Sequence, residues 1–194
     1  MLAGVPSAPS PEALHEAALA HLARYGASTT TLRRMLERRI DRWVQSAIRA
    51  DPEGTDAIGS QAAEAKRVVS EIVGRLAAAG ALDDRAFAAT RAQRLLRGGR
   101  SRRAVAAHLA ARGIDPKDAE AAVPKDDETE LAAALVFARR RRIGPFRARP
   151  EGNEGGLRER AILARAGFGR EVACRALRME EAEAETLIRR LRLG

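Results

Sequence analysis

The chain has 194 residues, of which 45% are hydrophobic and only 3% aromatic, and its formal net charge is +9. A core built from Ala, Leu, Val and Ile, in a chain with 31% charged residues, favours helices over strands. No apolar run reaches the about 18 residues of a membrane span, and the single cysteine excludes an internal disulfide, so we expect a reducing cytoplasm and no membrane partner.

Apolar periodicity and helix-stop signals predict ten helices and no strand. The first ten residues, MLAGVPSAPS, are expected to form a disordered arm. Clusters of Pro and Gly predict linkers at Asp51–Gly59 and Ile143–Gly156. The helices are expected at residues 11–25, 28–48, 60–79, 83–97, 101–112, 115–123, 127–141, 156–166, 169–177 and 180–192.

One phrase of the sequence occurs twice. LAARGI, which ends at Ile114, returns 54 residues later as LARAGF, which ends at Phe168. In each copy a glycine, Gly113 or Gly167, follows the last helical residue and precedes an apolar one. This pattern is typical of a helix stop in which glycine takes the left-handed conformation. Asp115 then offers an N-cap for the next helix. The phrase therefore predicts a corner between two helices.

The match extends upstream and defines a larger repeat. A serine and two apolar residues at four-residue spacing occur in two places, at Ser28, Leu32 and Leu36 and at Ser101, Val105 and Leu109. The third copy has Glu159 at the position of Leu32 and Val105. Three copies of one helical unit predict a repeat array. The predicted organisation is an arm at 1–10, repeats at 11–79, 80–124 and 125–178, and a C-terminal helix at 179–194.

The stretch GALDDRAFA, from Gly80 to Ala88, is followed by SRRAVAAHLAARGID. Together they resemble the middle repeat of the RecX family, bacterial regulators of the RecA recombinase. ALAHLARYGASTTTLRRML resembles the first repeat and RAILARAGFGREVACRAL the third, so that the resemblance covers about residues 12 to 178. The motif residues that carry it, with an expected structural role, are Asp83, Asp84, Phe87, Leu109, Gly113, Ile114, Gly167 and Phe168.

The resemblance implies an all-α protein with three tandem three-helix repeats, helix-turn-helix-like, in a curved elongated array with an extra C-terminal helix. It also implies binding along the groove of the RecA–single-stranded-DNA filament. The implied effect is modulation, usually inhibition, of filament growth, ATP hydrolysis and strand exchange. We expect a monomer without cofactor, whose contact with single-stranded DNA is mainly electrostatic.

Basic residues are unevenly placed along the chain. From Arg85 to Arg112 there are eight arginines and no acid. Arginine binds phosphates and carboxylates bidentately, so this stretch is the predicted contact site for nucleic acid or for RecA. A solvated basic face is the alternative. The first three of the candidate residues recur at three-residue spacing on one helical face; the whole set is Arg91, Arg94, Arg97, Arg100, Arg102 and Arg103.

No catalytic or metal site is predicted. Asp83 and Asp84 have no His, Cys or third acid at ligand spacing, so the pair is interpreted as a helix N-cap and a first-turn charge. The three histidines occur singly, and no nucleophile, base and orienting group form a set. The predicted function is therefore non-enzymatic, and the resemblance implies that it is regulatory.

Two other functions stay open. The corner at residues 109–119 resembles the helix-turn-helix of transcription regulators, although Arg112 falls where that motif usually buries an apolar residue. A purely structural helical adaptor is the second alternative. The scarcity of aromatic residues disfavours base stacking, on which many single-strand binders depend, and favours electrostatic contact with a nucleoprotein.

Overall fold

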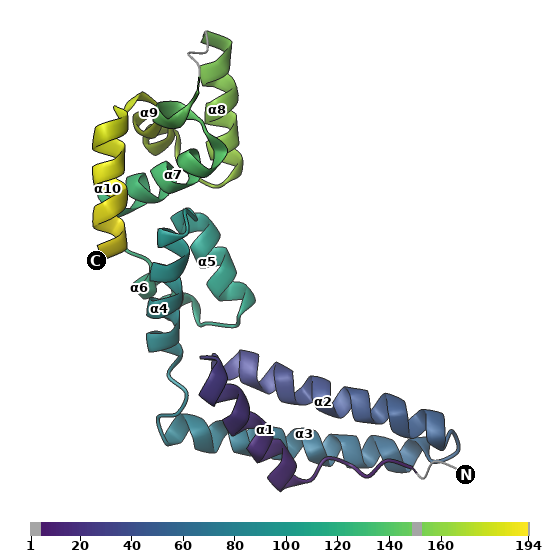
Figure 1. Cartoon of the computed structure of the whole chain (residues 1–194). Coiled ribbons are helices and arrows are strands. Elements are labelled where there is room, and N and C mark those ends of the chain that lie inside the picture. The colour runs from purple at the N-terminus through teal and green to yellow at the C-terminus, as the bar shows by residue number, and fades with distance from the viewer. Residues whose placement is uncertain (1–4, 149–152, 194) are drawn as a thin grey trace. The chain divides into compact units, whose positions relative to one another are not determined.

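The computed structural model describes residues 5–148 and 153–193 of the chain. Within these residues the secondary structure consists of ten α-helices and one short 3-10 helix, and there is no strand (Figure 1). This confirms the predicted all-α class. The chain forms two compact units, Met1–Phe87 (unit 1) and Ala88–Gly194 (unit 2), and the division falls within helix α4.

Unit 1 contains α1 (Pro11–Arg24), α2 (Thr29–Ala50) and α3 (Thr55–Ala78). The two long helices, α2 and α3, lie side by side and α1 packs against both (Figure 1). Their apolar residues follow the helical period, which is why one face of each is buried. Leu36 and Ile40 of α2 and Ile72 of α3 are fully buried in this core. The buried Ser28 begins α2, since its side chain accepts a hydrogen bond from Thr31 N at 3.1 Å.

Two segments of unit 1 differ from the sequence-based expectation. The predicted linker at 51–59 is shorter, because α3 already begins at Thr55. Ile58 is buried against the core, and this burial outweighs the low helix propensity of Gly59. Residues 5–10, expected within a disordered arm, have no regular secondary structure. They nevertheless contact the unit, since Trp43 Nε1 donates a hydrogen bond to the carbonyl of Pro6 at 2.8 Å.

Unit 2 is organised around one buried helix, α7 (Asp127–Arg141). An unbroken run of its residues from Glu130 to Val136 is buried, and α7 packs against both α9 and α10. The unit also holds the short helix η1 (Gly144–Phe146). The unit also includes α4 (Asp84–Arg97) from Ala88 onward. Its other helices are α5 (Arg102–Ala111), α6 (Pro116–Ala122), α8 (Asn153–Arg165), α9 (Arg170–Arg178) and α10 (Glu181–Leu193).

The two predicted glycine corners have the same backbone geometry. Gly113 has φ 71° and Gly167 has φ 91°, both in the left-handed region. The residue after each glycine donates a backbone hydrogen bond back to a leucine carbonyl, Ile114 to Leu109 at 3.2 Å and Phe168 to Leu163 at 3.1 Å. The corners therefore end α5 and α8 in the same way, as the repetition in the sequence indicates.

The third repeat departs from the other two in a specific place. Glu159 is buried where Leu32 and Val105 are buried in the earlier repeats. Its carboxylate accepts a hydrogen bond from Arg147 Nη2 at 2.6 Å. Arg147 belongs to the predicted linker at 143–156, which instead contains η1 and the first residues of α8; residues 149–152 lie outside the described part of the chain. An ion pair between the buried Glu159 and the half-buried Arg147 thus takes the place of an apolar contact.

Candidate functional site

The aspartate pair at the start of α4 is engaged in helix capping. Asp83 Oδ1 accepts a hydrogen bond from Ala86 N at 2.9 Å. Asp84 Oδ1 accepts one from Thr29 N at 2.7 Å and so joins the start of α4 to the start of α2. Within the described residues no group of three or more His, Cys, Asp and Glu side chains is placed to hold a metal. The sequence predicted the local cap but not the contact with α2.

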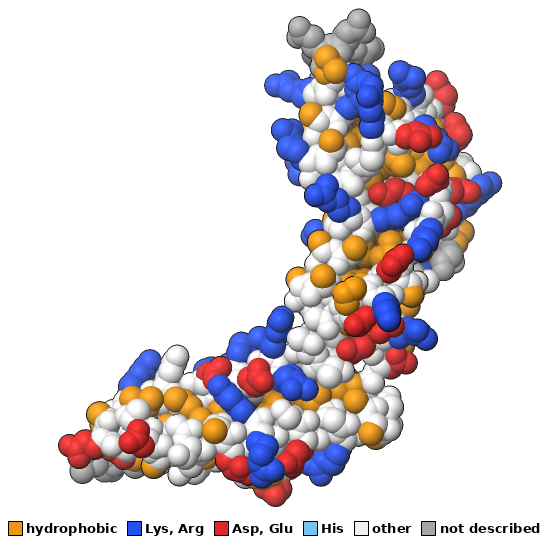
Figure 2. Space-filling model, turned by 180° about the vertical axis from the view of Figure 1, so that it is seen from behind, with side chains coloured by type: hydrophobic (Ala, Val, Ile, Leu, Met, Phe, Trp, Pro, Cys, Tyr) orange, Lys and Arg blue, Asp and Glu red, His pale blue; other side chains and the backbone are white. Residues whose placement is uncertain are grey.

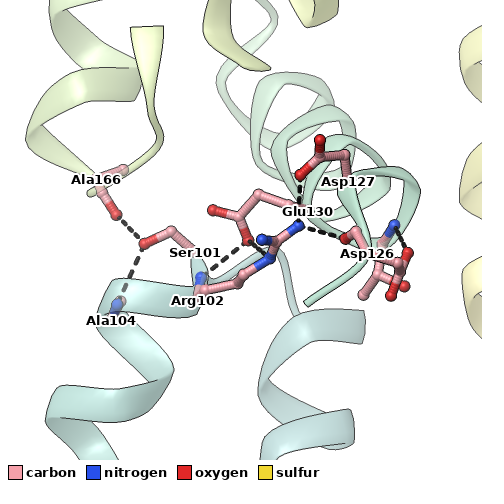
Figure 3. A network of polar contacts seen from close by, with 8 residues as sticks. Ser101, Arg102, Ala104, Asp126, Asp127, Glu130 and Ala166 are labelled. Atoms are coloured by element: carbon pink, nitrogen blue, oxygen red, sulfur yellow. Dashed lines mark hydrogen bonds and ion pairs between the residues drawn. The ribbon is translucent and has the colours of Figure 1, made fainter. Parts of the chain in front are cut away.

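Arg102, one of the six predicted contact arginines, is bound inside unit 2 (Figure 3). Its Nη2 donates to Asp127 Oδ1 at 3.0 Å and to the carbonyl of Asp126, and its Nε lies 3.7 Å from Glu130 Oε2. The side chain is 27% exposed. Arg102 is therefore already paired within unit 2, because acids 24 to 28 residues later in the chain surround it.

The same network fixes the first turn of α5. Glu130 is buried and accepts a hydrogen bond from Arg102 N at 2.9 Å, as a carboxylate at a helix N-terminus does. Burial raises the pKa of Glu130, and the hydrogen bond and the charge of Arg102 oppose that rise. Ser101 Oγ accepts from Ala104 N at 3.2 Å and donates to the carbonyl of Ala166 at 2.7 Å. Figure 3 shows these contacts together, and they make this a structural junction.

A second group of basic side chains gathers between α4 and α5. Arg91 Nε donates to His108 Nε2 at 3.1 Å, so the imidazole accepts there as a neutral ring does. Burial lowers the pKa of Arg91, and the charges of Arg112 and Arg94 lower it further. Burial likewise lowers the pKa of His108, followed by the charges of Arg91, Arg112 and Arg100. We call these five residues, Arg91, Arg94, Arg100, His108 and Arg112, the α4–α5 basic cluster.

The cluster contains two residues that the sequence did not propose for the site. His108 and Arg112 are four residues apart, and residues at this spacing lie on the same face of a helix. Both lie in the acid-free stretch that ends at Arg112. Their helical spacing within that stretch was the available signal. What the sequence lacked was the packing of α5 against Arg91 of α4.

The remaining candidate arginines lie elsewhere in unit 2. Arg97 lines a cavity of about 330 Å³ together with residues of α7 and α10. Arg103 lines a groove between α5 and α6. Of the six predicted residues, three thus belong to the α4–α5 basic cluster, and the others, Arg97, Arg102 and Arg103, line a cavity or a groove. Figure 2 shows acidic side chains of unit 2 toward one edge, among basic ones, while the described residues along the opposite edge are basic or uncharged.

Fold and site together define a helical-repeat protein of helix-turn-helix-like units that carries a basic surface cluster. The family model for the second three-helix domain of RecX matches residues 83–123. The chain is 36% identical over 168 residues to regulatory protein RecX of Myxococcus xanthus, a match that covers 84% of this chain and 83% of the relative. The chain therefore belongs to the RecX family of regulatory proteins.

Two further comparisons agree with this assignment. Regulatory protein RecX of Agrobacterium fabrum is 33% identical over 108 residues, which cover 56% of this chain and 58% of that one. The crystal structure of RecX from Lactobacillus salivarius matches with a TM-score of 0.55, covering 95% of this chain and 97% of the other at 17% identity, and so shares its fold. Among the helices that the structure describes, none is both long and apolar enough to span a membrane.

Proposed function

We propose that this chain binds the filament that RecA forms on single-stranded DNA and restrains its growth, ATP hydrolysis and strand exchange. Membership of a family of regulatory proteins supports a regulatory role. The observation that carries the proposed mode of binding is the α4–α5 basic cluster. The protein acts by binding rather than by catalysis, and its partner is a polyanionic nucleoprotein.

The electrostatics of the cluster favour an anionic ligand. The charges that act on Arg91 and His108 come from other arginines, and each lowers a pKa by repulsion. A phosphate or carboxylate placed here would relieve that repulsion, because an opposite charge favours the protonated form of both groups. Guanidinium groups bind either anion bidentately. The cluster thus suits the DNA backbone or an acidic surface of the recombinase.

The proposal is tested with a double charge reversal, Arg94→Glu with Arg100→Glu. Both side chains are exposed, so the fold should survive. Arg178→Glu with Arg189→Glu, at exposed positions of α9 and α10, changes the net charge equally and serves as the control. The measurements are ATP hydrolysis by RecA, with the protein added before and after filament formation, and affinity for single-stranded DNA at several salt concentrations. The cluster variant should lose inhibition, and its salt slope should fall by about 0.7 for each lost phosphate contact.

The pH dependence provides an independent arm of the same test. The pKa of His108 is lowered below its ordinary value of 6.5, so the free protein keeps this ring neutral in a range where an exposed histidine is protonated. A bound anion favours the protonated ring, and affinity should therefore rise as the pH falls below 6.5. His108→Gln should remove this rise.

Each outcome separates the possibilities. If inhibition is lost while DNA affinity is intact, the cluster contacts the recombinase itself. If the variant keeps both, the cluster is a solvated face and the site assignment is wrong. If the parent protein leaves RecA unaffected, the proposed function fails. A preference for one duplex over random sequence by orders of magnitude would instead favour the transcription-regulator alternative.

A further inference from the structure

A groove between α5 and α6 is floored by small side chains. Its volume is about 530 Å³. Ala107 and Ala110 of α5 are exposed along it and Ala119 of α6 is buried at its base. Methyl groups at these positions leave a channel of the kind into which the side-chain ridge of another helix fits.

A second groove lies at the equivalent place in the next repeat. It runs between α8 and α9 and has a volume of about 450 Å³. Each residue that lines it lies 54 residues after one that lines the first groove, the offset that also relates Gly113 to Gly167. The residues of the second groove are Leu157, Arg160, Ala161, Ala164, Arg170 and Ala173. At three of the six equivalent positions both grooves have alanine, so the floor of the groove is itself repeated.

Repeat 1 provides an internal contrast. In the alignment that pairs Ser28 with Ser101, the exposed alanines of α5 correspond to charged residues of α2, Ala107 to Arg34 and Ala110 to Glu37. Arg33, at the position of Ala106, extends toward α3, where its Nη1 lies 3.5 Å from Ser70 Oγ. In repeat 1 charged side chains, Arg34 and Glu37, thus stand at two positions that are alanine in both repeats 2 and 3. The position of Arg33 is alanine in repeat 2 and arginine, Arg160, in repeat 3.

The chemistry of the two grooves identifies the kind of occupant. The floors are apolar and the linings contain no aromatic ring, so neither groove offers a platform for base stacking. Leu157 at the edge of the second groove is 62% exposed, which suits an apolar contact with another protein. Both rims carry positive charge, from Arg103 in the first groove and from Arg160 and Arg170 in the second. Arg102 also lines the first groove but is paired with acids of α7, and the one carboxylate in the two linings, Glu120, is paired with Lys125 at 2.8 Å.

We propose that the α5–α6 and α8–α9 grooves are two equivalent docking sites for one short amphipathic helix of a partner protein, with an apolar ridge and acidic flanks. Two copies of one groove in one chain match a partner that presents the same helix repeatedly, as a polymer of identical subunits does. This inference rests on the proposed function in one respect, that the polymer is the recombinase filament. The acidic flanks pair with the basic rims and the ridge fills the alanine floor.

The test fills each groove with a longer neutral side chain, Ala107→Gln in one and Ala161→Gln in the other. Both positions are exposed on helices and glutamine is a good helix former, so circular dichroism should be unchanged. Ala89→Gln, at an exposed position of α4 that lines neither groove, is the matched control. When both grooves are occupied at once, either single variant should lower affinity for RecA filaments by roughly 100-fold or more, because the avidity of two linked sites is lost.

A second measurement does not depend on the recombinase. A synthetic helical peptide with a leucine ridge flanked by glutamates is titrated into the whole chain by calorimetry. Two peptides should bind the parent protein and the Ala89→Gln control, one should bind each single variant, and none the double variant. A peptide with lysine in place of glutamate should not bind.

The two measurements distinguish failure of the groove inference from failure of the proposed function. Absence of peptide binding, a stoichiometry that the variants leave unchanged, or equal binding of the lysine peptide would overturn the groove inference, whatever the filament does. Two-site peptide binding by a parent protein that ignores RecA filaments would remove the proposed function and leave the grooves as docking sites for another polymer. Filament affinity that stays at the parental level in the double variant would show that the filament does not use the grooves. An equal loss of affinity for bare single-stranded DNA would assign them to nucleic acid and also overturn the inference.

Discussion

Single residues decide how closely the third repeat follows the other two. Glu159 was recognisable from the sequence as a mismatch in the apolar pattern, but its partner was not. Arg147 lies in a segment that Pro and Gly content marked as a linker, and no local pattern connects the two residues. The same limit applies to Arg102, whose neighbours in sequence are basic while its contacts, Asp127 and Glu130, come from another helix. Charge counts along a sequence predict a basic region but not which of its members is already paired.

The ion pair between Arg147 and Glu159 gives a prediction at this scale. Arg147→Ala should lower the free energy of unfolding by about 3 kcal/mol, because it leaves a buried carboxylate unpaired. The double variant Arg147→Leu with Glu159→Leu should recover most of that loss, since apolar side chains can replace a buried pair. Urea denaturation followed by circular dichroism measures both, with Arg158→Ala, an exposed arginine of α8, as the control. A neutral Arg147→Ala would show that the pair does not stabilise the repeat.

Among the secondary-structure elements, agreement with the sequence is best where a helix end is set by local chemistry. Ser28, Ser101 and Asp115 each accept a backbone hydrogen bond at the start of a helix, and capping residues of this kind can be identified in a sequence. Agreement is poorer where burial sets the boundary. The sequence predicts a start of α3 at residue 60, because Gly59 and the residues before it are typical of a loop. The helix begins at Thr55 instead, since burial of Ile58 stabilises the helical conformation of this segment.

The glycine corners give a prediction for the helices that they end. Gly113→Val should lower the free energy of unfolding by roughly 1–2 kcal/mol, because a β-branched residue tolerates the left-handed conformation poorly. Gly167→Val should cost more, since a Cβ there would lie 2.6 Å from Ser101 Oγ in addition. Gly74→Ala, in open space within α3, should have the opposite sign and stabilise by up to about 1 kcal/mol. The midpoints of thermal denaturation rank the stabilities of the three variants. An unchanged midpoint for either valine variant would show that the backbone at that position does not require glycine.

For the whole molecule, the sequence predicts the repeats and their order but not the compact units. The repeats can be recognised from short local motifs such as LAARGI, because such a motif does not depend on contacts with distant residues. The compact units depend on which apolar faces meet, and their division falls within α4, a helix whose own sequence has no break. Each unit has its own core, with Leu36 and Ile72 in unit 1 and Leu135 in unit 2.

The separate cores predict separate unfolding behaviour. The only tryptophan, Trp43, lies in the core of unit 1, so its fluorescence follows that unit, whereas circular dichroism follows all helices. Leu135→Ala should destabilise unit 2 by about 2–5 kcal/mol and shift the dichroism transition to lower denaturant without moving the fluorescence midpoint. Leu36→Ala should move the fluorescence midpoint instead. If Leu135→Ala shifts both signals together, the chain unfolds as one cooperative body.

The close approach of Gly167 to Ser101 has a consequence for building with these modules. Ser101 donates to the carbonyl of Ala166, and the missing side chain at 167 leaves just the space that the serine occupies. The serine that begins α5, the second helix of repeat 2, thus fits against the glycine at the corner of repeat 3. A chimaera that exchanges modules between relatives, or a longer array made by inserting an extra one, must therefore carry this glycine and serine together, or the inserted module will not seat against its neighbour.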